Sequence, residues 1–457
     1  MSIQELATVI LAAGKGTRMK SDCPKVLHPL VGKPLAAYPV RLAQELGCSP
    51  TVMVVGHQVE RVQQQFADED IVFVHQEQQL GTGHAFQISH QVLKDFSGTV
   101  LLLCGDVPLL RCQTIDEMLQ AHASAGAAVS VLTANMEDPR GYGRIVRSGA
   151  EIEHIVEEKD ASAEEKKITE INTGIYALEV PLAFELLGQL SNDNAQGEYY
   201  LTDIIALART QGYKVVASTL DDVSEAMGIN DRVQLAQAAA IMRERINYAH
   251  MVAGVTLIDP ATTYIDDSVK IGVDTVIYPG AHLRGNTTIG SNCVVETGVV
   301  IDSCSIGNDS YIKAGSALEE ADLGEHSTIG PMAHLRPGTV LCGNNKIGNF
   351  VETKKAVIGE RSQASHLTYI GDAELGRDVN LGCGTITCNY DGVNKHKTVI
   401  EDGVFVGSDT QFIAPVTIGR NSLIGAGSTI TKDVPADALA LSRSEQKVIA
   451  GWCKRKK

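Results

Sequence analysis

The chain of 457 residues is long enough for two or more domains, because a single hydrophobic core usually stops growing at roughly 250–300 residues. A hydrophobic content of 44% is ample for packed cores and excludes a disordered protein. The net charge of −16 argues against a nucleic-acid partner, because phosphate contacts need a broad basic face. An anionic ligand would therefore have to be held by local cations, backbone amides or a divalent metal ion.

Two features of the sequence bear on the cellular compartment. No N-terminal signal or long apolar span is recognisable, so we expect a cytoplasmic protein without membrane insertion. The ten cysteines form no CxxC pair, and most of them stand alone in apolar strands. They are therefore predicted to be reduced and buried.

The first 230 residues alternate short apolar runs with amphipathic stretches. The apolar runs are residues 8–13, 51–56, 71–75, 99–106 and 128–134. Apolar strands that alternate with helices predict a largely parallel, doubly wound sheet in an α/β domain. Ligands bind such sheets beyond the carboxyl ends of the strands. The segments LAAGKG (11–16) and CGDVP (104–108) both follow strands, so we place them on one rim.

The segment LAAGKGTRMKSDCPKVL (11–27) has the glycines and cations of a phosphate-binding loop. A P-loop needs a Gly-Lys pair directly followed by Ser or Thr, four residues after an earlier Gly. Here Lys15 lies between Gly14 and Gly16, so the spacing does not fit. It is not a dinucleotide fingerprint either, because Met19 stands where a third glycine is needed. The kind of phosphate loop stays open at this point.

Residues 231–253 have helical spacing without an interrupting Gly or Pro. Leu235, Ala239, Met242 and Ile246 fall on one helical face. We predict an amphipathic linker helix, and a helix buried inside a domain is the alternative.

After Gly254, aliphatic residues recur every six positions, with one-residue slips between regular stretches. The stretches are Ile271, Ile277, Leu283, Ile289, Val295, Ile301; then Ile306, Ile312, Leu318; then Leu323, Ile329, Leu335, Leu341, Ile347; and last Ile400, Val406, Phe412, Ile418, Ile424, Ile430. A period of six fits a solenoid in which each flat face takes one hexapeptide. Three faces give a coil of about 18 residues, so residues 269–434 form on the order of nine coils. The prediction is an all-β domain, a left-handed parallel β-helix of hexapeptide repeats.

Catalytic or binding residues are expected where the repeat becomes irregular, between residues 349 and 397. The polar and aromatic residues that collect there are Lys354, His366, Tyr369, Asn380, Asn389, Tyr390 and Lys395, and Arg336 lies just before them. Arg336 and Lys354 are one coil apart and should stack, which indicates an anion site. A solvated charged face is the alternative.

His366 is a candidate general base within this cluster. Glu352 lies near enough in sequence to hold its imidazole as a neutral base. A zinc hydratase built on a β-helix is unlike this sequence, because His326, His334, His366 and His396 include no pair spaced by five residues.

Both halves resemble one enzyme family across nearly the whole chain. LAAGKGTRMKSDCPKVL, QLGTGHA, GDVPL, GYGRIV, VEEKDA, INTGIY and NAQGEYYLTD look like the motifs of a sugar-nucleotide pyrophosphorylase. GNFVETKKA, SHLTYIGDAE, GTITCNYDG and VGSDTQ are similar to those of a hexapeptide acyltransferase. With these motifs in this order, the chain resembles the family of bifunctional enzymes that are both N-acetylglucosamine-1-phosphate uridylyltransferases and glucosamine-1-phosphate N-acetyltransferases.

For the second half, the resemblance implies acetyl transfer from acetyl-CoA to the amine of glucosamine 1-phosphate. His366 matches the general base of the family. The residues that match its sugar-phosphate ligands are Arg336, Lys354, Tyr369, Asn380 and Lys395. The residues that match its acetyl-CoA ligands are Cys383, Asn389, Tyr390, Ser408, Ala426 and Arg443. Cys383 stands where the family commonly has Ala, and we expect it to be a packing variant rather than a nucleophile.

For the first half, the resemblance implies uridylyl transfer from UTP to N-acetylglucosamine 1-phosphate with release of pyrophosphate. Asp106 and Asn230 match the Mg²⁺ ligands, and Arg18 and Lys25 match the catalytic phosphate partners. The matching ligands of UTP and of the sugar nucleotide are Leu11, Ala12, Ala13, Gly14, Lys25, Gln76, Gly81, Thr82, Cys104, Gly105, Asp106, Gly143, Glu157, Asn172 and Asn230. Cys104 replaces a Tyr that often precedes GDVP, and only its backbone is expected to matter.

The resemblance also implies the domain organisation and the assembly. Residues 1–232 would form a Rossmann-like uridylyltransferase domain, residues 233–253 a linker helix, and residues 254–457 the β-helix N-acetyltransferase domain. The family forms a homotrimer through the β-helix and supplies UDP-N-acetylglucosamine for peptidoglycan and lipopolysaccharide. The basic tail Lys454–Lys457 is either a solvated end or a contact for the CoA phosphates.

Two alternatives remain at this point. The first is a single-activity sugar-1-phosphate nucleotidyltransferase whose β-helix serves only for oligomerisation. It does not account for the polar cluster at residues 336–397. The second is a non-catalytic regulatory subunit with the same two folds, and it would be expected to lack Asp106 or the cations Arg18 and Lys25.

Overall fold

A computed structural model describes residues 5–453 of the chain. These residues divide into two compact units, one up to residue 242 and one from residue 243 onward. The basic tail discussed above lies outside the described residues.

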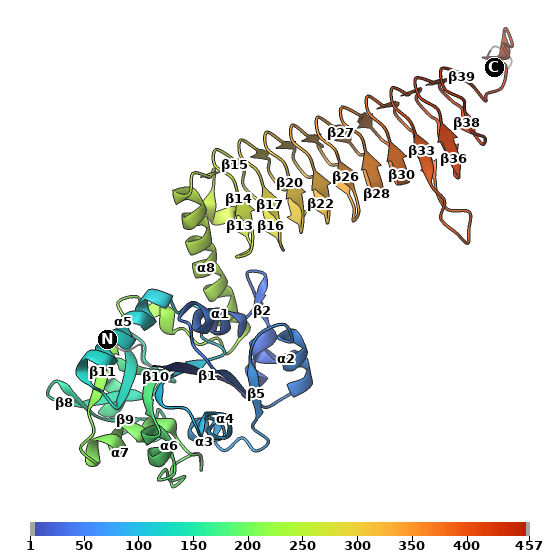
Figure 1. Ribbon diagram of the computed structural model, residues 1–457. Helices are drawn as coiled ribbons and strands as arrows, with labels where there is room; N and C mark the ends of the chain where they lie inside the picture. Colours follow the sequence, from blue (N-terminus) through green and yellow to red (C-terminus); the bar gives the residue numbers. More distant parts are fainter. Residues whose placement is uncertain (1–4, 454–457) are drawn as a thin grey trace. The chain divides into compact units, whose positions relative to one another are not determined.

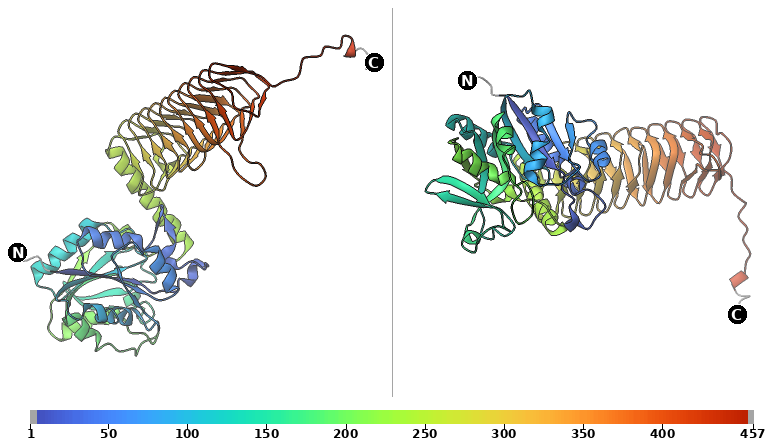
Figure 2. Two further views of the ribbon diagram at one scale, coloured as in Figure 1. Left: turned by 45° about the vertical axis from the view of Figure 1, so that its right-hand side comes forward. Right: turned by 90° about the horizontal axis from the view of Figure 1, so that it is seen from below.

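The first unit contains a nine-stranded mixed sheet with helices on both faces (Figures 1 and 2). The main path of the sheet runs β11-β7-β10-β6-β1-β4-β5, and β8 and β9 are attached beside β10. The strands are β1 (Leu6–Ala12), β4 (Thr51–Val55), β5 (Val72–His75), β6 (Gly98–Cys104), β7 (Val129–Asn135), β8 (Arg144–Ser148), β9 (Glu151–Val156), β10 (Glu170–Val180) and β11 (Val215–Thr219). A short hairpin of β2 (Pro29–Leu30) and β3 (Lys33–Pro34) stands apart.

Strand β10 departs from the largely parallel sheet that the apolar runs predict. It pairs antiparallel with both β6 and β7, whereas β1 pairs parallel with β4 and β6. The antiparallel hairpin of β8 and β9 adds a second departure. Antiparallel strands inserted into a parallel sheet do not change the apolar pattern of their neighbours, so the runs alone could not show them.

Successive residues of each strand face opposite layers, which explains the two cores of this unit. On β1, Val9 packs in the layer that also contains buried residues of α3, α4, α6 and α7, while Ile10 packs in the layer of α1, α2 and α5. The helices are α1 (Ala37–Glu45), α2 (Val59–Gln65), α3 (Thr82–Gln87), α4 (His90–Leu93), α5 (Cys112–Ala125), α6 (Leu182–Leu187) and α7 (Ile204–Thr210). Both faces of the sheet are therefore covered, as in a doubly wound domain.

Helix α8 (Arg232–Val252) contains the point at which the two units divide. In the first unit, Arg232 Nε donates to the carbonyl oxygen of Met19 at 3.2 Å. In the second unit, the buried Asn247 side chain donates from Nδ2 to the carbonyl oxygens of Pro260 and Thr263 at 2.8 and 3.0 Å. The last turns of α8 are thus bound into the first coil of the β-helix.

The second unit is a parallel β-helix whose coils stack along two sheets (Figure 1). The eleven-stranded sheet contains β12 (Thr256–Leu257), β15 (Val276–Ile277), β18 (Val294–Val295), β21 (Tyr311–Ile312), β24 (Thr328–Ile329), β27 (Lys346–Asn349), β29 (Gln363–His366), β31 (Asn380–Leu381), β34 (Phe405–Val406), β37 (Leu423–Ile424) and β39 (Leu439–Ala440). The seventeen-stranded sheet contains β13 (Tyr264–Ile265), β14 (Lys270–Ile271), β16 (His282–Arg284), β17 (Thr288–Ile289), β19 (Val300–Asp302), β20 (Ser305–Ile306), β22 (Ala317–Glu319), β23 (Asp322–Leu323), β25 (His334–Leu335), β26 (Val340–Leu341), β28 (Glu352–Ile358), β30 (Tyr369–Leu375), β32 (Ile386–Cys388), β33 (Thr398–Ile400), β35 (Gln411–Ile413), β36 (Val416–Ile418) and β38 (Thr429–Ile430).

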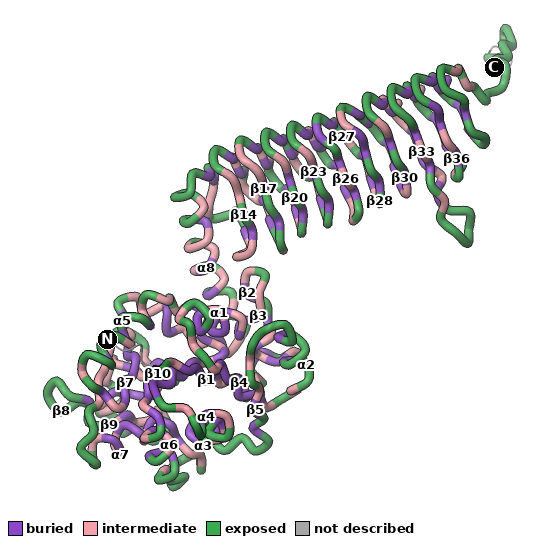
Figure 3. The backbone as a smooth tube through the Cα atoms, viewed as in Figure 1, coloured by how far each residue is buried: buried purple, intermediate pink, exposed green. Residues whose placement is uncertain are grey.

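The aliphatic residues of the six-residue period form the interior of the coils. Ile289, for example, pairs in register with Ile271 on one side and Ile306 on the other. The first pair is 18 residues apart and the second 17, which is the one-residue slip seen in the sequence. Figure 3 shows the resulting inner stripe of buried residues along the stack. Stacking of like residues from coil to coil therefore specifies the fold.

One segment leaves the regular coil as a protruding loop, residues 389–397 between β32 and β33 (Figure 1). Within it, Asp391 accepts hydrogen bonds from the backbone amides of Val393 and Asn394 and lies 2.6 Å from His396 Nε2. The ladder resumes directly after the loop, where Thr398 pairs with Ala373 of the preceding coil.

The cysteines differ from the prediction of buried thiols. All ten are free in the described part of the chain, but only Cys293 and Cys304 are buried. Cys342 and Cys453 are exposed, and the others are partly exposed. The reason is that coil corners and strand ends, where several of them lie, face solvent. Among residues 5–453, no helix has the length and hydropathy needed to span a membrane.

Candidate active sites

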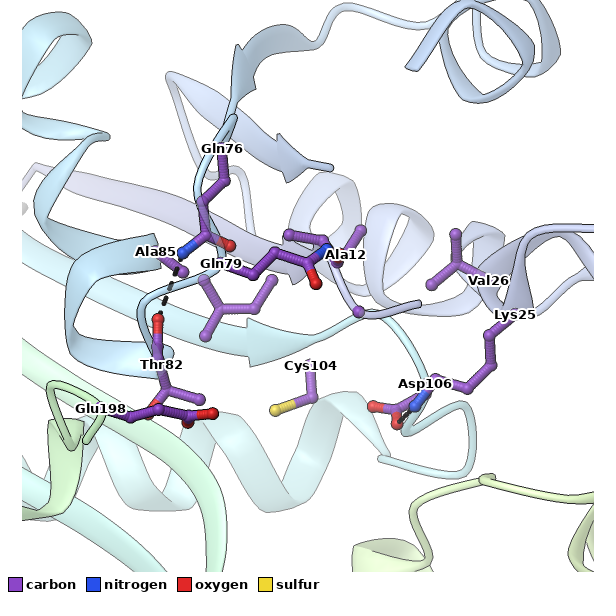
Figure 4. A pocket seen from close by; sticks show the side chains of 14 residues that line it. Ala12, Lys25, Val26, Gln76, Gln79, Thr82, Ala85, Cys104, Asp106 and Glu198 are labelled. Atoms are coloured by element: carbon purple, nitrogen blue, oxygen red, sulfur yellow. Dashed lines mark hydrogen bonds and ion pairs between the residues drawn. The ribbon is translucent and has the colours of Figure 1, made fainter. Parts of the chain in front are cut away.

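The first unit has a cavity of about 340 Å³ at the carboxyl ends of its central strands (Figure 4). The residues lining it are Leu11, Ala12, Ala13, Gly14, Lys25, Val26, Gln76, Gln79, Gly81, Thr82, Ala85, Cys104, Asp106 and Glu198. Ten of these residues are among the predicted nucleotide ligands. Parallel pairing of β1 with β6, with Leu11 opposite Cys104, brings the two predicted loops to one rim.

The glycines of the first loop allow its close packing. Gly16 has a φ of +60°, and a Cβ at this position would lie 2.6 Å from the Cβ of Lys25. Only glycine therefore fits between the loop and the lysine. This contact holds the stem of Lys25 against the loop and lets its ammonium group reach the end of the cavity.

Four polar side chains meet at this end of the cavity. Lys25 Nζ is bound to Asp106 Oδ2 and lies 3.3 Å from Asn230 Oδ1. Arg18 Nη2 donates to the same Asn230 oxygen at 2.9 Å. Asp106 and Asn230, the predicted metal ligands, thus direct their oxygens at one cation, although they are far apart in the sequence.

The donor set at this position fits Mg²⁺. Carboxylate and amide oxygens are the hard ligands that this ion prefers, and it usually takes one or two from protein and the rest from phosphate and water. No group of three or more His, Cys, Asp or Glu side chains that could hold a metal occurs in residues 5–453. Asp106 and Asn230 would hold the ion, with Lys25 as the cation that contacts their oxygens in the structure described here.

The predicted sugar ligands lie on or next to three strands: Asn172 is on β10, Gly143 directly precedes β8, and Glu157 directly follows β9. The backbone nitrogen of Asn172 donates to the Gly143 carbonyl oxygen at 2.9 Å, which joins two of them. Glu157 accepts from Thr202 Oγ1 at 3.1 Å, and burial raises the pKa of its carboxyl group above the usual value. Gly105 donates from its amide to the Leu11 carbonyl oxygen at 2.9 Å and so joins the two loops rather than lining the cavity.

Two cavity residues were not assigned from the sequence. Gln79 donates from Nε2 to the Ala13 carbonyl oxygen at 2.5 Å and so ties the first loop to the QLGTGHA segment. Glu198 also lines the cavity. Gln79 lies in the motif QLGTGHA and Glu198 in the motif NAQGEYYLTD. The two motifs therefore indicated the right segments, but not a role for these two residues.

Cys104 is a neutral thiol inside this cavity. Its Sγ donates to the Gly174 carbonyl oxygen at 3.6 Å. Burial, and secondly the charge of Asp106, raises the pKa of this thiol to about 12. The side chain therefore contributes packing and a weak hydrogen bond rather than a nucleophile.

This pKa leads to a labelling prediction. At pH 8, iodoacetamide should alkylate the exposed Cys342 and Cys453 while Cys104 stays unmodified, because only the thiolate reacts. Raising the pH by one unit should increase the Cys104 rate about tenfold, since its thiolate fraction grows tenfold below the pKa. Peptide mass spectrometry gives the rates, and unfolded protein should label at every cysteine. Complete labelling of Cys104 at pH 8 in folded protein would contradict this assignment.

In the second unit, one corner of the β-helix aligns the predicted base with the predicted acetyl-CoA ligands. His366, Cys383, Ser408 and Ala426 each directly precede a corner residue of positive φ, namely Leu367, Gly384, Asp409 and Gly427. The amide of Asp409 donates to the Cys383 carbonyl oxygen, and that of Gly427 to the Ser408 carbonyl oxygen. These residues therefore form a column over successive coils. Arg443 Nη1 donates to the Ala426 carbonyl oxygen at 3.0 Å and joins the end of the column.

The predicted sugar-phosphate ligands lie on the two faces that meet at this corner. Lys354 and Tyr369 are on β28 and β30. Arg336 lies in the coil before Lys354, directly after Leu335, which pairs with Thr353 of β28. The Tyr369 ring lies over Gly371, where a Cβ would come within 2.4 Å of the phenol oxygen. Asn380 begins β31 on the other face.

Lysines gather at the next corner of the coil, where Lys355 and Asp372 have positive φ, and one carboxylate lies nearby. Lys395, from the protruding loop, approaches Lys354 and is the main cause that lowers the pKa of the Lys354 ammonium group. Asp372 Oδ2 lies 3.9 Å from Lys354 Nζ and also accepts a hydrogen bond from Asn389 Nδ2. Two adjacent ammonium groups with one partial counter-ion repel each other, and a bound anion such as phosphate would relieve this repulsion.

The expected contact between Glu352 and His366 is wrong. Glu352 Oε1 accepts from Arg336 Nη1 at 2.8 Å instead. Glu352 lies on β28 directly opposite His334, while His366 belongs to β29 of the other sheet. The carboxylate therefore orients the arginine, and His366 is an exposed side chain at the corner.

Comparisons with known proteins give matches to both units of the chain. Residues 8–173 match the MobA-like NTP transferase domain, residues 257–362 the GMPPB C-terminal domain, and residues 397–432 the bacterial transferase hexapeptide (six repeats). The chain is 63% identical to the bifunctional protein GlmU of Syntrophotalea carbinolica over 99% of this chain and 97% of that one. It is 57% identical to GlmU of Geotalea uraniireducens over the full length of both. The chain belongs to the GlmU family of bifunctional proteins.

Proposed function

We propose that the chain makes UDP-N-acetylglucosamine in two steps, acetyl transfer from acetyl-CoA to glucosamine 1-phosphate and then uridylyl transfer from UTP. Membership of a family of bifunctional proteins supports this function over the single-activity alternative. The observation that carries it is the corner column of the β-helix, because a β-helix that served only for assembly would not need His366 aligned with Ser408 beside a lysine cluster.

For uridylyl transfer, the residues of the first cavity position the reactants and neutralise charge. The backbone of Leu11–Gly14 would lie along the nucleotide, and Gln76, Gly81 and Thr82 would contact the uracil. Arg18 and Lys25 would hold the phosphate oxygens of the attacking sugar phosphate and of the leaving pyrophosphate. Bound at Asp106 and Asn230, Mg²⁺ would supply further neutralisation of phosphate charge.

For acetyl transfer, His366 would remove a proton from the ammonium group of glucosamine 1-phosphate. The free amine then attacks the thioester carbon, the carbon–sulfur bond breaks, and CoA leaves as the thiolate and takes up a proton. Ser408, in the same column, would donate to the oxyanion of the tetrahedral intermediate. Arg336, Lys354 and Lys395 would bind the sugar phosphate, with Tyr369 and Asn380 around the sugar. Cys383, Asn389, Tyr390, Ala426 and Arg443 would line the acetyl-CoA groove.

Each of the two activities would belong to one part of the chain. Residues 1–232 would carry uridylyl transfer and residues 254–457 acetyl transfer, with 233–253 as the linker. Hexapeptide repeats support an oligomer, and we propose a homotrimer in the cytoplasm with small-molecule substrates.

The function is tested by supplying glucosamine 1-phosphate, acetyl-CoA, UTP and Mg²⁺ and following free thiol and pyrophosphate separately. Thiol should appear without UTP, whereas pyrophosphate should require acetyl-CoA unless N-acetylglucosamine 1-phosphate is added. Pyrophosphate release without any thiol release would support the single-activity alternative. Release of neither product would support a regulatory subunit.

A further inference from the structure

Strand β10 has an irregularity next to the proposed sugar subsite. Its pairing with β7 shifts register between Asn172 and Tyr176. Gly174, between them, has a φ of +80°, in the left-handed region that favours glycine. The bulge bends the strand so that the side chain of Asn172 turns back on its own chain, and its Oδ1 accepts from the Gly174 amide at 3.0 Å.

Tyr176 completes this arrangement from inside the core. Its side chain is 1% exposed, and its hydroxyl oxygen lies 3.0 Å from Asn172 Oδ1. Burial, and secondly the charge of Glu157, raises the pKa of this phenol well above its usual value. The hydroxyl group therefore keeps its proton and can act as the donor of the hydrogen bond to Asn172.

These two bonds fix the orientation of the Asn172 amide. A backbone N–H can only donate, so the side-chain atom that faces it must be the oxygen. A carbonyl oxygen has two lone pairs, and here the Gly174 amide and the Tyr176 hydroxyl group take one each. The Nδ2 donors must then point away from the bulge, and they have no hydrogen-bond partner within the described residues. They are available to an acceptor oxygen of a ligand.

The position of Asn172 indicates which ligand this is. Its backbone amide donates to Gly143, and Gly174 contacts Cys104, which lines the nucleotide cavity. The free donors thus lie at the side of the cavity where the sugar is expected. A sugar hydroxyl or acetamido carbonyl oxygen is the kind of acceptor that they would meet.

We propose that Tyr176 is a positioning residue for uridylyl transfer, which holds the Asn172 amide so that its nitrogen faces the sugar of N-acetylglucosamine 1-phosphate. This inference rests on the proposed uridylyltransferase function and deepens its sugar subsite. Tyr176 does not touch the substrate, and it acts only through Asn172. Without the hydroxyl group, the amide is held by the Gly174 N–H alone, so the orientation that presents its nitrogen to the ligand is less strongly favoured.

The test compares Tyr176→Phe with Tyr38→Phe in the full-length protein. Tyr38 is a matched control, because it is also buried in the first unit and donates its hydroxyl group to the Leu30 carbonyl oxygen, away from the cavity. Tyr176→Phe should raise the KM for N-acetylglucosamine 1-phosphate about three- to tenfold, the worth of one neutral hydrogen bond, with the KM for UTP unchanged. Tyr38→Phe should change neither constant, and thermal unfolding shows whether each variant is folded.

A double-mutant cycle tests whether Tyr176 acts through Asn172. Asn172→Ala should raise the KM for the sugar phosphate further, and adding Tyr176→Phe to it should have no additional effect. An unchanged sugar KM in Tyr176→Phe, an equal rise for both substrates, or a full additional effect in the Asn172→Ala background would overturn the inference. Absence of pyrophosphate release by the wild type would overturn the proposed function and this inference with it.

Discussion

Replacing His366 with asparagine should slow acetyl transfer about 10²- to 10⁴-fold and leave uridylyl transfer at its normal rate. Asparagine keeps a polar side chain of similar reach but cannot take a proton from the amine. The loss should appear mainly in kcat, because the sugar-phosphate ligands Arg336 and Lys354 remain. The measurement is the release of CoA thiol at saturating substrates, with pyrophosphate release followed in parallel.

His326→Asn is the matched control for this prediction. His326 is exposed on the same β-helix but at a different corner, where its φ of +57° suits asparagine. This variant should keep both activities. If His366→Asn retained full acetyl transfer, another group would have to be the base and the assignment of the corner column would be wrong.

The second prediction concerns the other site and should have the opposite pattern. Asp106→Asn should lower uridylyl transfer about 10²- to 10³-fold while acetyl transfer is unchanged, since one charged group that stabilises the transition state is lost. The amide keeps the size of the carboxylate and one oxygen, but it removes the negative charge that binds Lys25 and would bind Mg²⁺. Chelation with EDTA should reproduce this selective loss in the wild type.

Asp116→Asn provides the control, because Asp116 is an exposed carboxylate of the same unit that accepts a hydrogen bond from Gln120 on the surface of α5. Its activities should match the wild type. A loss of both activities in Asp106→Asn would indicate damage to the whole chain, and full uridylyl transfer would exclude Asp106 from the site. The two predictions together separate the sites, since each variant should lose the activity that the other keeps.

The β-helix was predictable because its sequence repeats what the structure repeats. Each inward residue meets the equivalent residue of the next coil, so the period of six in the sequence is the period of the core. The sheet topology of the first unit was harder to predict from the sequence. Apolar runs indicate buried strands, but they contain no information about direction, and β10 therefore escaped prediction as an antiparallel strand.

The arrangement of the candidate sites was predictable where their residues directly follow a strand, and not where it depends on contacts between residues far apart in the sequence. The cavity loops come directly after β1 and β6, so position in the chain was enough to place them on one rim. The hydrogen bond from Arg18 to Asn230 joins residues more than two hundred positions apart, and only family resemblance brought them together beforehand. Glu352 was assigned to the wrong partner because closeness in sequence does not say which sheet of a coil a side chain faces.

The loop at residues 389–397 shows that coil length and coil packing are separate properties of this fold. Ile386 pairs with Gln411 across the loop, although most equivalent residues are 17 or 18 positions apart. The interior stays in step because the strands, and not the corners, set the vertical spacing of about 4.8 Å. A corner can thus gain or lose residues without a change in the core, so the side chains at one edge can vary while the scaffold stays the same.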